Sequence, residues 1–280
     1  MSRHGVPRTN EVRPVRLPDL LDHLTFLVMK HESSGGTTVG VGEMNGNIQQ
    51  TIAELHMATR ILVGEEILDG FGHVSARHPD LPERYFMLIS NLSGPPTESS
   101  VLELDADSNP VRSSDVWPSI ERFIHGEVYR QRPDVAAIVH THAPSLIPFG
   151  VCSVPLRPLY HMGGFLEDGP PVFDIRTKHD VTNMLVTSRE IGQSLASSLG
   201  NRAMVLMRGH GATVVGTSLK EAVFRSVYAT QNARLLPVAL QLGQPTFLDP
   251  GEARLADELH HVVVARPWEY WMKKHGLGLA

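Results

Sequence analysis

The stretch "AAIVHTHAPSLIPFG", residues 136–150, places two histidines at the end of an apolar run. The run of Ala, Ile and Val predicts a buried strand, in which residues two apart point to the same face. His140 and His142 therefore project to one side, about 6–7 Å apart along the chain. At that spacing two imidazoles can converge on one metal ion. The stretch predicts both a strand and a candidate metal site.

Helical and extended patterns alternate on both sides of this stretch, which predicts a layered α/β domain. We expect helices where apolar residues recur at helical spacing and strands where short apolar runs are bounded by turn residues. The predicted helices are 51–68, 117–134, 188–201, 218–243, interrupted at Pro237, and 250–264. The predicted extended segments are 72–79, 84–90, 100–107, 135–142, 155–166, 170–177 and a strand pair over 202–216.

The first part of the chain has a different composition from the rest. A Pro- and Arg-rich start is followed by an amphipathic piece, residues 17–31, and by a run rich in Gly, Ser, Thr and Asn, residues 32–47. Such a run is typical of a loop or linker. We therefore predict an irregular extension over residues 1–48 and one catalytic domain over residues 49–280.

Composition excludes several classes of protein. The 280 residues carry a net charge of −5 with no basic run, so no nucleic-acid partner is expected. The single cysteine, Cys152, excludes a disulfide framework and a cysteine-based zinc site, and we expect it to be a small core residue. No apolar run approaches the ~20 residues of a membrane span, and the N-terminus lacks a secretory pattern. These features predict a cytoplasmic protein without a membrane partner.

A third histidine appears in "LMRGHGATVVG", residues 206–216, where His210 lies between two glycines. Glycines allow a tight turn and a close approach to a ligand, so a third imidazole could join His140 and His142. A catalytic metal site needs three protein ligands and an open position, often with a carboxylate nearby. Glu121 is the candidate carboxylate, with His125 one helical turn further on. Ordinary core histidines and a solvated Glu121 remain open alternatives on the residues alone.

The pattern of Glu121, "QRPDVAAIVHTHAP" (131–144) and "LMRGHGATVVGTSLKEAV" (206–223) resembles the class II aldolase/adducin family. The resemblance implies that His140, His142 and His210 bind one divalent metal ion, Mn, Zn or Fe(II). It implies that Glu121 ligates the open metal or acts as acid and base. It further implies a three-layer α/β/α sandwich with a largely antiparallel central sheet, and a homo-oligomer, a tetramer, with sites near subunit interfaces.

Two departures from the family pattern bear on the substrate. Sugar-phosphate aldolases of the family carry "GNVS" and a serine pair that bind phosphate, whereas this chain has "GHVS" (72–75), with His73 for the Asn, and Ser119-Ile120. Isoleucine cannot donate a hydrogen bond, which disfavours a phosphorylated ketose. Adducin-type members lack the full metal set, whereas this chain retains the three histidines and the glutamate.

Further segments resemble a branch of the family that acts on aromatic acids, namely "ERFIHGEVYRQRPD" (121–134), "HAPSLIPFGV" (142–151) and "PLRPLYHMGGFL" (155–166). In the third segment, Tyr160, His161 and Phe165 suit a flat apolar substrate, and ordinary packing is the alternative. Tyr160 is taken as a catalytic candidate, and His161 and Phe165 as substrate contacts. Arg122 or Arg157 could pair with a second carboxylate of the substrate.

The leading hypothesis is a metal-dependent decarboxylase of a hydroxylated aromatic carboxylic acid, with Glu121 or His73 protonating the ring carbon. The second is a non-haem Fe(II), O2-dependent oxidative decarboxylase that forms 4-hydroxy-3-prenylbenzoate in aminocoumarin antibiotic biosynthesis. Imidazole ligands suit several metals, so the type of ligand does not distinguish the first hypothesis from the second. The third is an aldolase acting on an unphosphorylated substrate. The fourth, a non-catalytic scaffold, is disfavoured by the complete ligand set.

Overall fold

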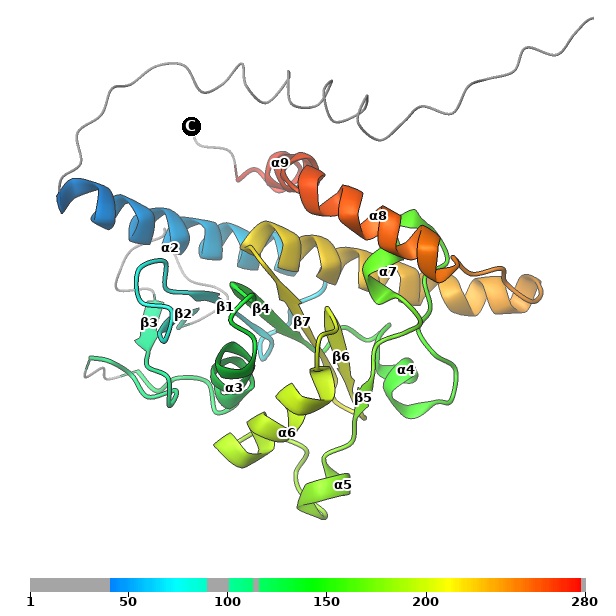
Figure 1. Ribbon diagram of the computed structural model, residues 1–280, viewed down its shortest axis with the longest axis horizontal. Helices are drawn as coiled ribbons and strands as arrows, with labels where there is room; N and C mark the ends of the chain where they lie inside the picture. Colours follow the sequence, from blue (N-terminus) through cyan, green and yellow to red (C-terminus); the bar gives the residue numbers. More distant parts are fainter. Residues whose placement is uncertain (1–40, 90–100, 113–115, 278–280) are drawn as a thin grey trace, which may run out of the picture. The chain divides into compact units, whose positions relative to one another are not determined.

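The computed structural model describes residues 41–89, 101–112 and 116–277, and within these ranges the chain forms a seven-stranded sheet covered by helices (Figure 1). Residues 1–40 of the predicted extension lie outside the described residues. Helix α2 (Val41–Gly64) runs through the predicted boundary at residue 48, so the Gly-rich run expected as a linker is helical from Val41 onward. The assignment of residues 1–48 as an extension stays a prediction.

The sheet is largely antiparallel, as predicted. Its only parallel pair among the described strands is β5 with β6, at one edge. In spatial order the strands are β3 (Val101–Leu104), β2 (Tyr85–Leu88), β1 (His73–Arg77), β4 (Ala137–Thr141), β7 (Gly211–Gly216), β6 (Met204–Met207) and β5 (Val172–Phe173). The stretch that opens the sequence argument supplies β4, which lies between β1 and β7 at the centre of the sheet.

Helices cover both faces of the sheet and make three layers. One apolar cluster joins the sheet to α2, α7 (Leu219–Leu242) and α9 (Ala265–Lys274), and a second joins it to α3 (Phe123–Gln131) and α6 (Arg189–Leu199). Figure 1 shows α2 and α7 along one face and α3 and α6 along the other. Neighbouring residues of β4 alternate between the two clusters, Ile138 facing α3 and α6 and Val139 facing α2 and α7. The predicted α/β/α sandwich is confirmed.

The remaining described helices are short or peripheral. They are α4 (Ile147–Val151), the 3-10 helix η3 (His161–Leu166), α5 (Arg176–His179) and α8 (Pro250–Val263). Helix α8 begins with a capping box, in which Asp249 and Glu252 satisfy each other's backbone N–H groups. Helix α8 packs on η3, which in turn packs on α7.

The structure corrects several predicted elements. The predicted helix 117–134 is helical only from Phe123, because the residues before it form tight turns in which Ile124 N–H bonds to Glu121 O. Residues 161–166, predicted as extended, form η3, and α7 runs through Pro237 without a break. The sequence patterns do not predict helices α4, α5 and α9, and α5 takes the last two residues of the predicted extended segment 170–177.

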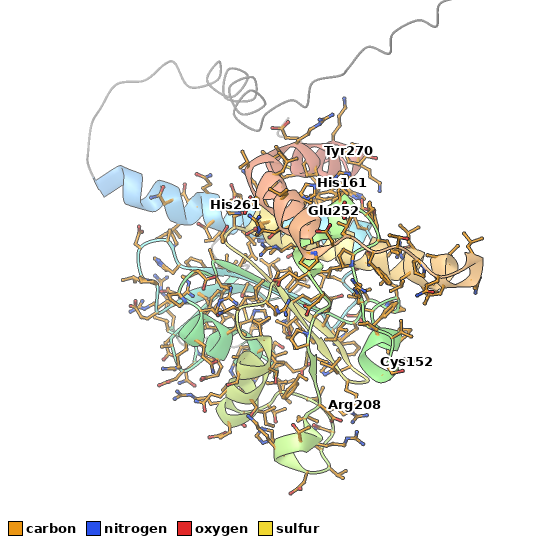
Figure 2. All side chains as sticks on the ribbon, turned by 45° about the vertical axis from the view of Figure 1, so that its right-hand side comes forward. Cys152, His161, Arg208, Glu252, His261 and Tyr270 are labelled. Atoms are coloured by element: carbon orange, nitrogen blue, oxygen red, sulfur yellow. The ribbon has the colours of Figure 1, made fainter. Side chains whose placement is uncertain are left out.

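The structure also corrects the prediction that Cys152 is a small core residue. It lies at the end of α4 and is exposed rather than a core residue (Figure 2).

Candidate active site

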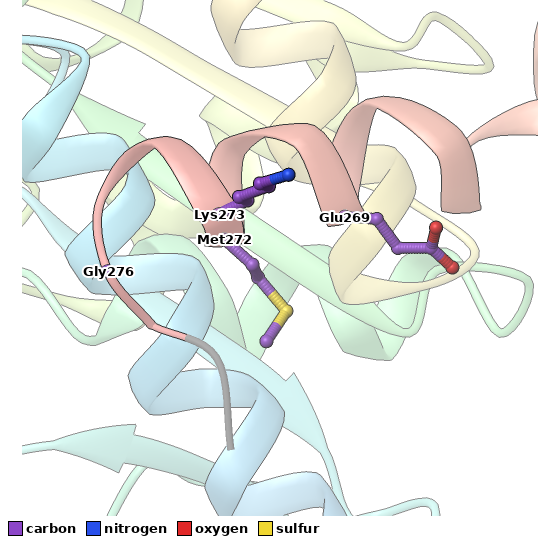
Figure 3. A pocket seen from close by; sticks show the side chains of 4 residues that line it. All are labelled: Glu269, Met272, Lys273 and Gly276. Atoms are coloured by element: carbon purple, nitrogen blue, oxygen red, sulfur yellow. The ribbon is translucent and has the colours of Figure 1, made fainter. Parts of the chain in front are cut away.

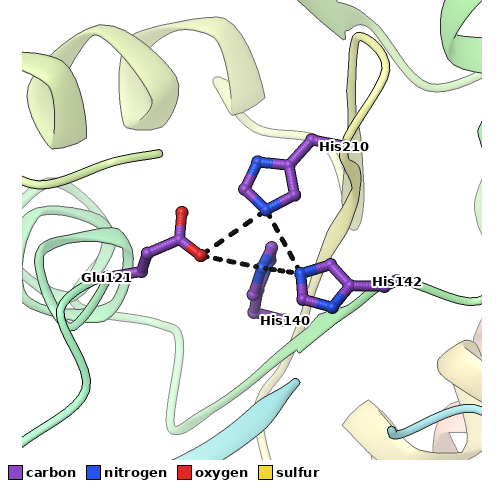
Figure 4. Close-up of side chains that lie close together, drawn as sticks. All are labelled: Glu121, His140, His142 and His210. Atoms are coloured by element: carbon purple, nitrogen blue, oxygen red, sulfur yellow. Dashed lines mark hydrogen bonds and ion pairs between the residues drawn. The ribbon is translucent and has the colours of Figure 1, made fainter. Parts of the chain in front are cut away.

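Three histidines meet at one end of the central strands (Figure 4). His140 is in β4 and His142 follows its end, while His210 lies in the turn that joins β6 to β7. Because β7 pairs with β4, this turn lies beside the end of β4. The Nε2 atom of His142 is 3.0 Å from that of His140 and 3.2 Å from that of His210. The predicted convergence of the three imidazoles is therefore present.

Glu121 completes the group of ligand atoms. It lies in the turn before α3, and not within the helix as predicted. One carboxylate oxygen, Oε2, is 3.6 Å from His140 Nε2 and 3.5 Å from His210 Nε2. The other, Oε1, accepts the backbone N–H of Val186 at 2.9 Å, which fixes the carboxylate plane. We call Glu121, His140, His142 and His210 the ligand cluster.

Hydrogen bonds on the outer side of the rings define which nitrogen faces the ligand cluster. His142 Nδ1 lies 3.2 Å from Asp69 Oδ2, and His210 Nδ1 lies 3.1 Å from the Met184 carbonyl oxygen. Both acceptors require a proton on Nδ1, so in the neutral imidazoles the two Nε2 atoms carry lone pairs. Two lone pairs facing each other at 3.2 Å repel, unless a cation lies between them. The donor chemistry therefore fits a bound metal ion.

The spacing of the four ligand atoms also fits one ion. Nitrogen and oxygen ligands placed about 2.0–2.2 Å from a tetrahedral ion lie about 3.3–3.6 Å apart. The four measured separations run from 3.0 to 3.6 Å, and all four atoms lie within 4.8 Å of one another. The cluster can thus hold a divalent cation through three imidazoles, with Glu121 as a fourth ligand or as a base beside it.

Burial and the mutual contacts shift the ionisation of these groups. Burial opposes the charge of Glu121, but its contacts with His140 and His210 outweigh burial and lower the pKa of the carboxyl. Burial lowers the pKa of His140. For His210 burial acts the same way, but the Glu121 carboxylate and the Met184 carbonyl outweigh it and raise the pKa. The metal-free cluster is therefore an ionised carboxylate that shares protons with its histidines.

A glycine lets the strands approach closely enough to form the cluster. A Cβ atom on Gly211, the first residue of β7, would collide with the carbonyl oxygen of Thr141 in β4. Gly209, on the other side of His210, has φ of +64°, a conformation that favours glycine. The two glycines that flank His210 in the sequence thus have separate roles, one in strand spacing and one in the turn.

His73 lies next to the ligand cluster and begins a line of buried polar groups. It is paired with His140 across β1 and β4, and the two ring centroids are 5.0 Å apart. Its Nδ1 is 2.7 Å from His125 Nε2, and the line continues through Ser75 to Tyr129. We call His73, His125, Ser75 and Tyr129 the buried series.

The imidazoles of the buried series are neutral. Burial, followed by the neighbouring histidines, lowers the pKa of His73 well below its usual range. Burial and His140 lower the pKa of His125 to about 3. Among the described residues His73 Nε2 has no hydrogen-bond partner, although such a buried group costs ~1–3 kcal/mol when unpaired.

The structure places Arg122 near Glu121 but ties down its side chain. Its Nε donates to the Ser108 carbonyl oxygen at 2.7 Å and one Nη to the Ser119 carbonyl oxygen at 3.2 Å. The guanidinium also lies 4.5 Å from the centre of the Phe123 ring. A role in substrate binding stays a prediction and would require these contacts to loosen.

The other predicted substrate contacts are not brought to the ligand cluster within one chain. Phe165 is buried against Phe224 in the apolar cluster of the α2 and α7 face, whereas His140 shares its face with Ile138, toward α3. Tyr160 donates to Gln231 of α7 at 3.3 Å, and His161 lies 5.3 Å from the His260 ring of α8. Arg157 lies over the Phe247 ring. These four side chains lie at η3, α7 and α8.

Sequence reasoning missed several groups that the structure brings to the site. Asp69 orients His142 and also accepts the backbone N–H groups of Phe71 and Gly72. The local signal was present, because an Asp two or three residues before Gly in a turn often caps backbone N–H groups in this way. No local sequence pattern marks Ser75 or Tyr129 as part of the site. The two residues meet only because β1 pairs with β4 and α3 packs on that face of the sheet.

One surface hollow is separate from this site. It is lined by Glu269, Met272, Lys273 and Gly276 at the end of α9 (Figure 3). Helix α9 belongs to the α2 and α7 face of the sheet, so the hollow lies away from the ligand cluster. We assign it no role in the chemistry.

The family model described as the class II aldolase and adducin N-terminal domain matches residues 53–236. The chain belongs to the class II aldolase and adducin family. All four residues of the ligand cluster fall within the matched region, and the predicted family is confirmed.

Relatives and solved structures of the class II aldolase family extend this result. The chain is 34% identical over 240 residues to the decarboxylase tropJ of Talaromyces stipitatus, covering 76% of this chain and 90% of that protein. It is 29% identical over 190 residues to a 3,4-dihydroxyphthalate decarboxylase of Arthrobacter keyseri, covering 61% and 71%. The L-fuculose 1-phosphate aldolase of Glaciozyma antarctica shares the fold, with a TM-score of 0.67 at 16% identity over 87% of this chain and 95% of that one. The prediction of a carbon–carbon lyase is confirmed at this level.

No helix in the described part of the chain combines the length and the apolarity that crossing a bilayer demands. The predicted cytoplasmic location stays a prediction.

Proposed function

We propose that this protein is a divalent-metal-dependent decarboxylase of a hydroxylated aromatic carboxylic acid. The observation that carries the proposal is the ligand cluster, in which three imidazole nitrogens and a carboxylate oxygen converge at 3.0–3.6 Å. Two relatives named as decarboxylases support the reaction class, and one of them is named for an aromatic dihydroxy acid. The metal and the substrate are both proposals.

Decarboxylation breaks the bond between a ring carbon and its carboxylate, leaves the electron pair on the ring, and requires one proton at that carbon. A bound divalent ion would supply a Lewis acid for a phenolic oxygen and an adjacent carboxylate. The Glu121 carboxylate lies beside His140 and His210, a position from which it could take the phenolic proton and return it to the ring carbon as CO2 leaves. His73, beside His140, is the second candidate for delivering the proton.

The proposed substrate contacts other than Arg122 lie away from the ligand cluster within one chain. Tyr160, His161 and Arg157 lie on the other face of the sheet from the cluster, so they could reach a cluster only in another copy of the chain. The proposed homo-oligomer, with sites near subunit interfaces, would supply such a copy. Phe165 is 3% exposed and packs as a core residue, so a direct contact with substrate finds no support in its position.

The deciding experiment measures CO2 release from a panel of hydroxylated aromatic acids and 4-hydroxyphenyl keto acids. The protein is loaded with Mn(II), Zn(II) or Fe(II) and tested with and without oxygen. Release without oxygen is the expected result and identifies a lyase. Release that requires both Fe(II) and oxygen would replace the proposal with the oxidative decarboxylase. No release under any condition would return the assignment to aldol cleavage of an unphosphorylated substrate.

A further inference from the structure

The buried series links α3 to the edge of the ligand cluster without a break. Tyr129 Oη is 2.7 Å from Ser75 Oγ, and Ser75 Oγ is 2.6 Å from His125 Nδ1. His125 Nε2 is 2.7 Å from His73 Nδ1. All four side chains are at least nine-tenths buried. Among the described residues, the two hydroxyl groups, both His125 ring nitrogens and His73 Nδ1 make their side-chain hydrogen bonds only with one another.

The two hydroxyl protons determine the direction of the hydrogen bonds. Among the described residues, Tyr129 Oη bonds only to Ser75, and Ser75 Oγ bonds only to Tyr129 and His125. Both hydroxyl protons find an acceptor in one arrangement, in which Tyr129 donates to Ser75 and Ser75 donates to His125 Nδ1. In the reverse direction the Tyr129 proton is left buried without an acceptor.

The direction then fixes both imidazoles. If His125 Nδ1 accepts, its proton is on Nε2, and it donates to His73 Nδ1. His73 Nδ1 is therefore bare and its proton is on Nε2, on the far side of the ring. That Nε2 is the buried nitrogen without a partner among the described residues, and its ring lies 5.0 Å from the ring of His140.

We propose that Tyr129, Ser75 and His125 are positioning residues that hold His73 as an Nε2–H donor, and that this N–H binds an anionic oxygen of the acid at the metal site. The choice of a carboxylate or phenolate oxygen as the acceptor rests on the proposed function. The direction of the hydrogen bonds in the buried series does not depend on the proposed function. Burial raises the pKa of Tyr129, so the phenol keeps its proton and stays able to donate to Ser75.

The direction is tested first in the full-length, zinc-loaded protein without substrate. Long-range proton–nitrogen NMR correlations of ¹⁵N-histidine-labelled protein distinguish protonated from bare ring nitrogens, and the His73 signals are assigned by their loss in His73→Gln. We expect His73 to be protonated at Nε2 and bare at Nδ1. Protonation at Nδ1 in the wild-type protein would overturn the inference, whatever reaction the enzyme catalyses.

Variants then test the positioning role with 2-hydroxybenzoate as the probe. Tyr129→Phe and Ser75→Ala each remove the group that sets the direction, so His73 should populate both tautomers. Affinity falls in proportion to the competent fraction, about twofold for equal populations and about tenfold when the bare Nε2 form dominates. Tyr85→Phe is the matched control, because the Tyr85 hydroxyl, also buried beside α3, donates to the Arg122 carbonyl outside the series.

The outcomes separate this inference from the proposed function. A shifted tautomer with weakened binding in Tyr129→Phe and Ser75→Ala, but not in Tyr85→Phe, supports it. Wild-type tautomer and affinity in both variants would overturn the positioning role. A shifted tautomer with unchanged affinity would overturn the contact between His73 and the acid. If the tautomers shift while no aromatic acid releases CO2, the direction stands and the decarboxylase proposal fails. If Tyr129→Phe does not fold, the tautomer and the affinity of Ser75→Ala alone test the positioning role.

Discussion

At the scale of single residues, Glu121 combines two tasks that one substitution can separate. Its Oε1 accepts the N–H of Val186, and its Oε2 faces His140 and His210. A glutamine at this position keeps a carbonyl oxygen for Val186 but replaces the second oxygen with an amide group that neither accepts nor releases a proton at neutral pH. The local backbone should therefore survive the loss of the acid–base group.

We expect Glu121→Gln to lower kcat by about 10²- to 10⁴-fold, the usual contribution of general acid–base catalysis, while the protein keeps its fold. Steady-state kinetics and thermal unfolding provide the test. Glu221→Gln is the control, since Glu221 is also buried and accepts a backbone N–H, from Thr217, but lies at the start of α7. Unchanged kinetics in Glu121→Gln would move the acid–base role to another residue.

Asp69 should act on the metal through His142. Asp69→Asn keeps an oxygen for the N–H groups of Phe71 and Gly72 but weakens the acceptor that holds the His142 Nδ1 proton. Loss of such an outer partner lowers metal affinity by about 10- to 100-fold. Competition with a chromophoric chelator measures the change. Asp105→Asn, in a turn with the same kind of backbone capping, should leave metal affinity as it is.

At the scale of elements, the site depends on how closely β7 approaches β4. We expect Gly211→Ala to destabilise the fold by about 1–3 kcal/mol, because the added methyl group forces the strands apart. It should also weaken metal binding, since β7 and β4 carry the segments that bear His210 and His142. Gly46→Ala in α2 is the control, because a Cβ there meets nothing within 4 Å. Denaturant unfolding measures the stability of both variants, and metal titration measures their metal affinity. Normal metal affinity in Gly211→Ala would show that metal binding does not need this spacing of the strands.

The elements also show what a sequence can predict. The two-residue period of β4 and the glycines around His210 are local signals, so the three histidines could be named as candidates without a structure, while the complete ligand set came from the family resemblance. Residues 161–166 could not, because η3 is set by tertiary packing, where a Cβ on Gly164 would press against the Ala253 carbonyl of α8. Helix α9 carries a sequence signal, because Trp268 and Trp271 are three residues apart, at helical spacing, and both are buried.

At the scale of the whole molecule, metal binding should couple to stability in a pH-dependent way. The folded pKa of His210 is raised, so its stabilisation of the metal-free protein is complete below the unfolded value of 6.5 and is lost as the pH rises through the folded value. The folded pKa of Glu121 is lowered, so its contribution is retained above 4.5 and does not change between pH 7.5 and 5.5. An ion must displace the His210 proton, which weakens its binding as the pH falls.

We therefore expect the difference in melting temperature between zinc-loaded and metal-free protein to narrow from pH 7.5 to pH 5.5. At zinc about 1,000 times above its Kd the stabilisation is about 4 kcal/mol, and it shrinks as the affinity falls. Calorimetric scans at several pH values measure it. A difference that widens toward acid would contradict the protonation scheme of the ligand cluster.

The predicted homo-oligomer can be tested from the apolar side chains on α8. Leu255, Leu259 and Val262 recur at helical spacing and are all exposed. Light scattering should give a mass that is a multiple of 30.8 kDa, and the double variant Leu255→Glu, Leu259→Glu should lower it. A wild-type protein that stays at 30.8 kDa would also remove the route by which Tyr160 and His161 could reach a site.

The pairing of His73 with His140 on one rung of the sheet has a consequence for how this enzyme could change its substrate over time. A slip of one residue between β1 and β4 would turn every inward group to the opposite face. A change of register in the central strands thus alters every side chain of the site at once. New specificity can arise gradually only where the backbone is free of the ladder, as in the turns before α3 and before β1. Directed evolution of such an enzyme should therefore randomise the residues of those turns and keep the residues of the central strands.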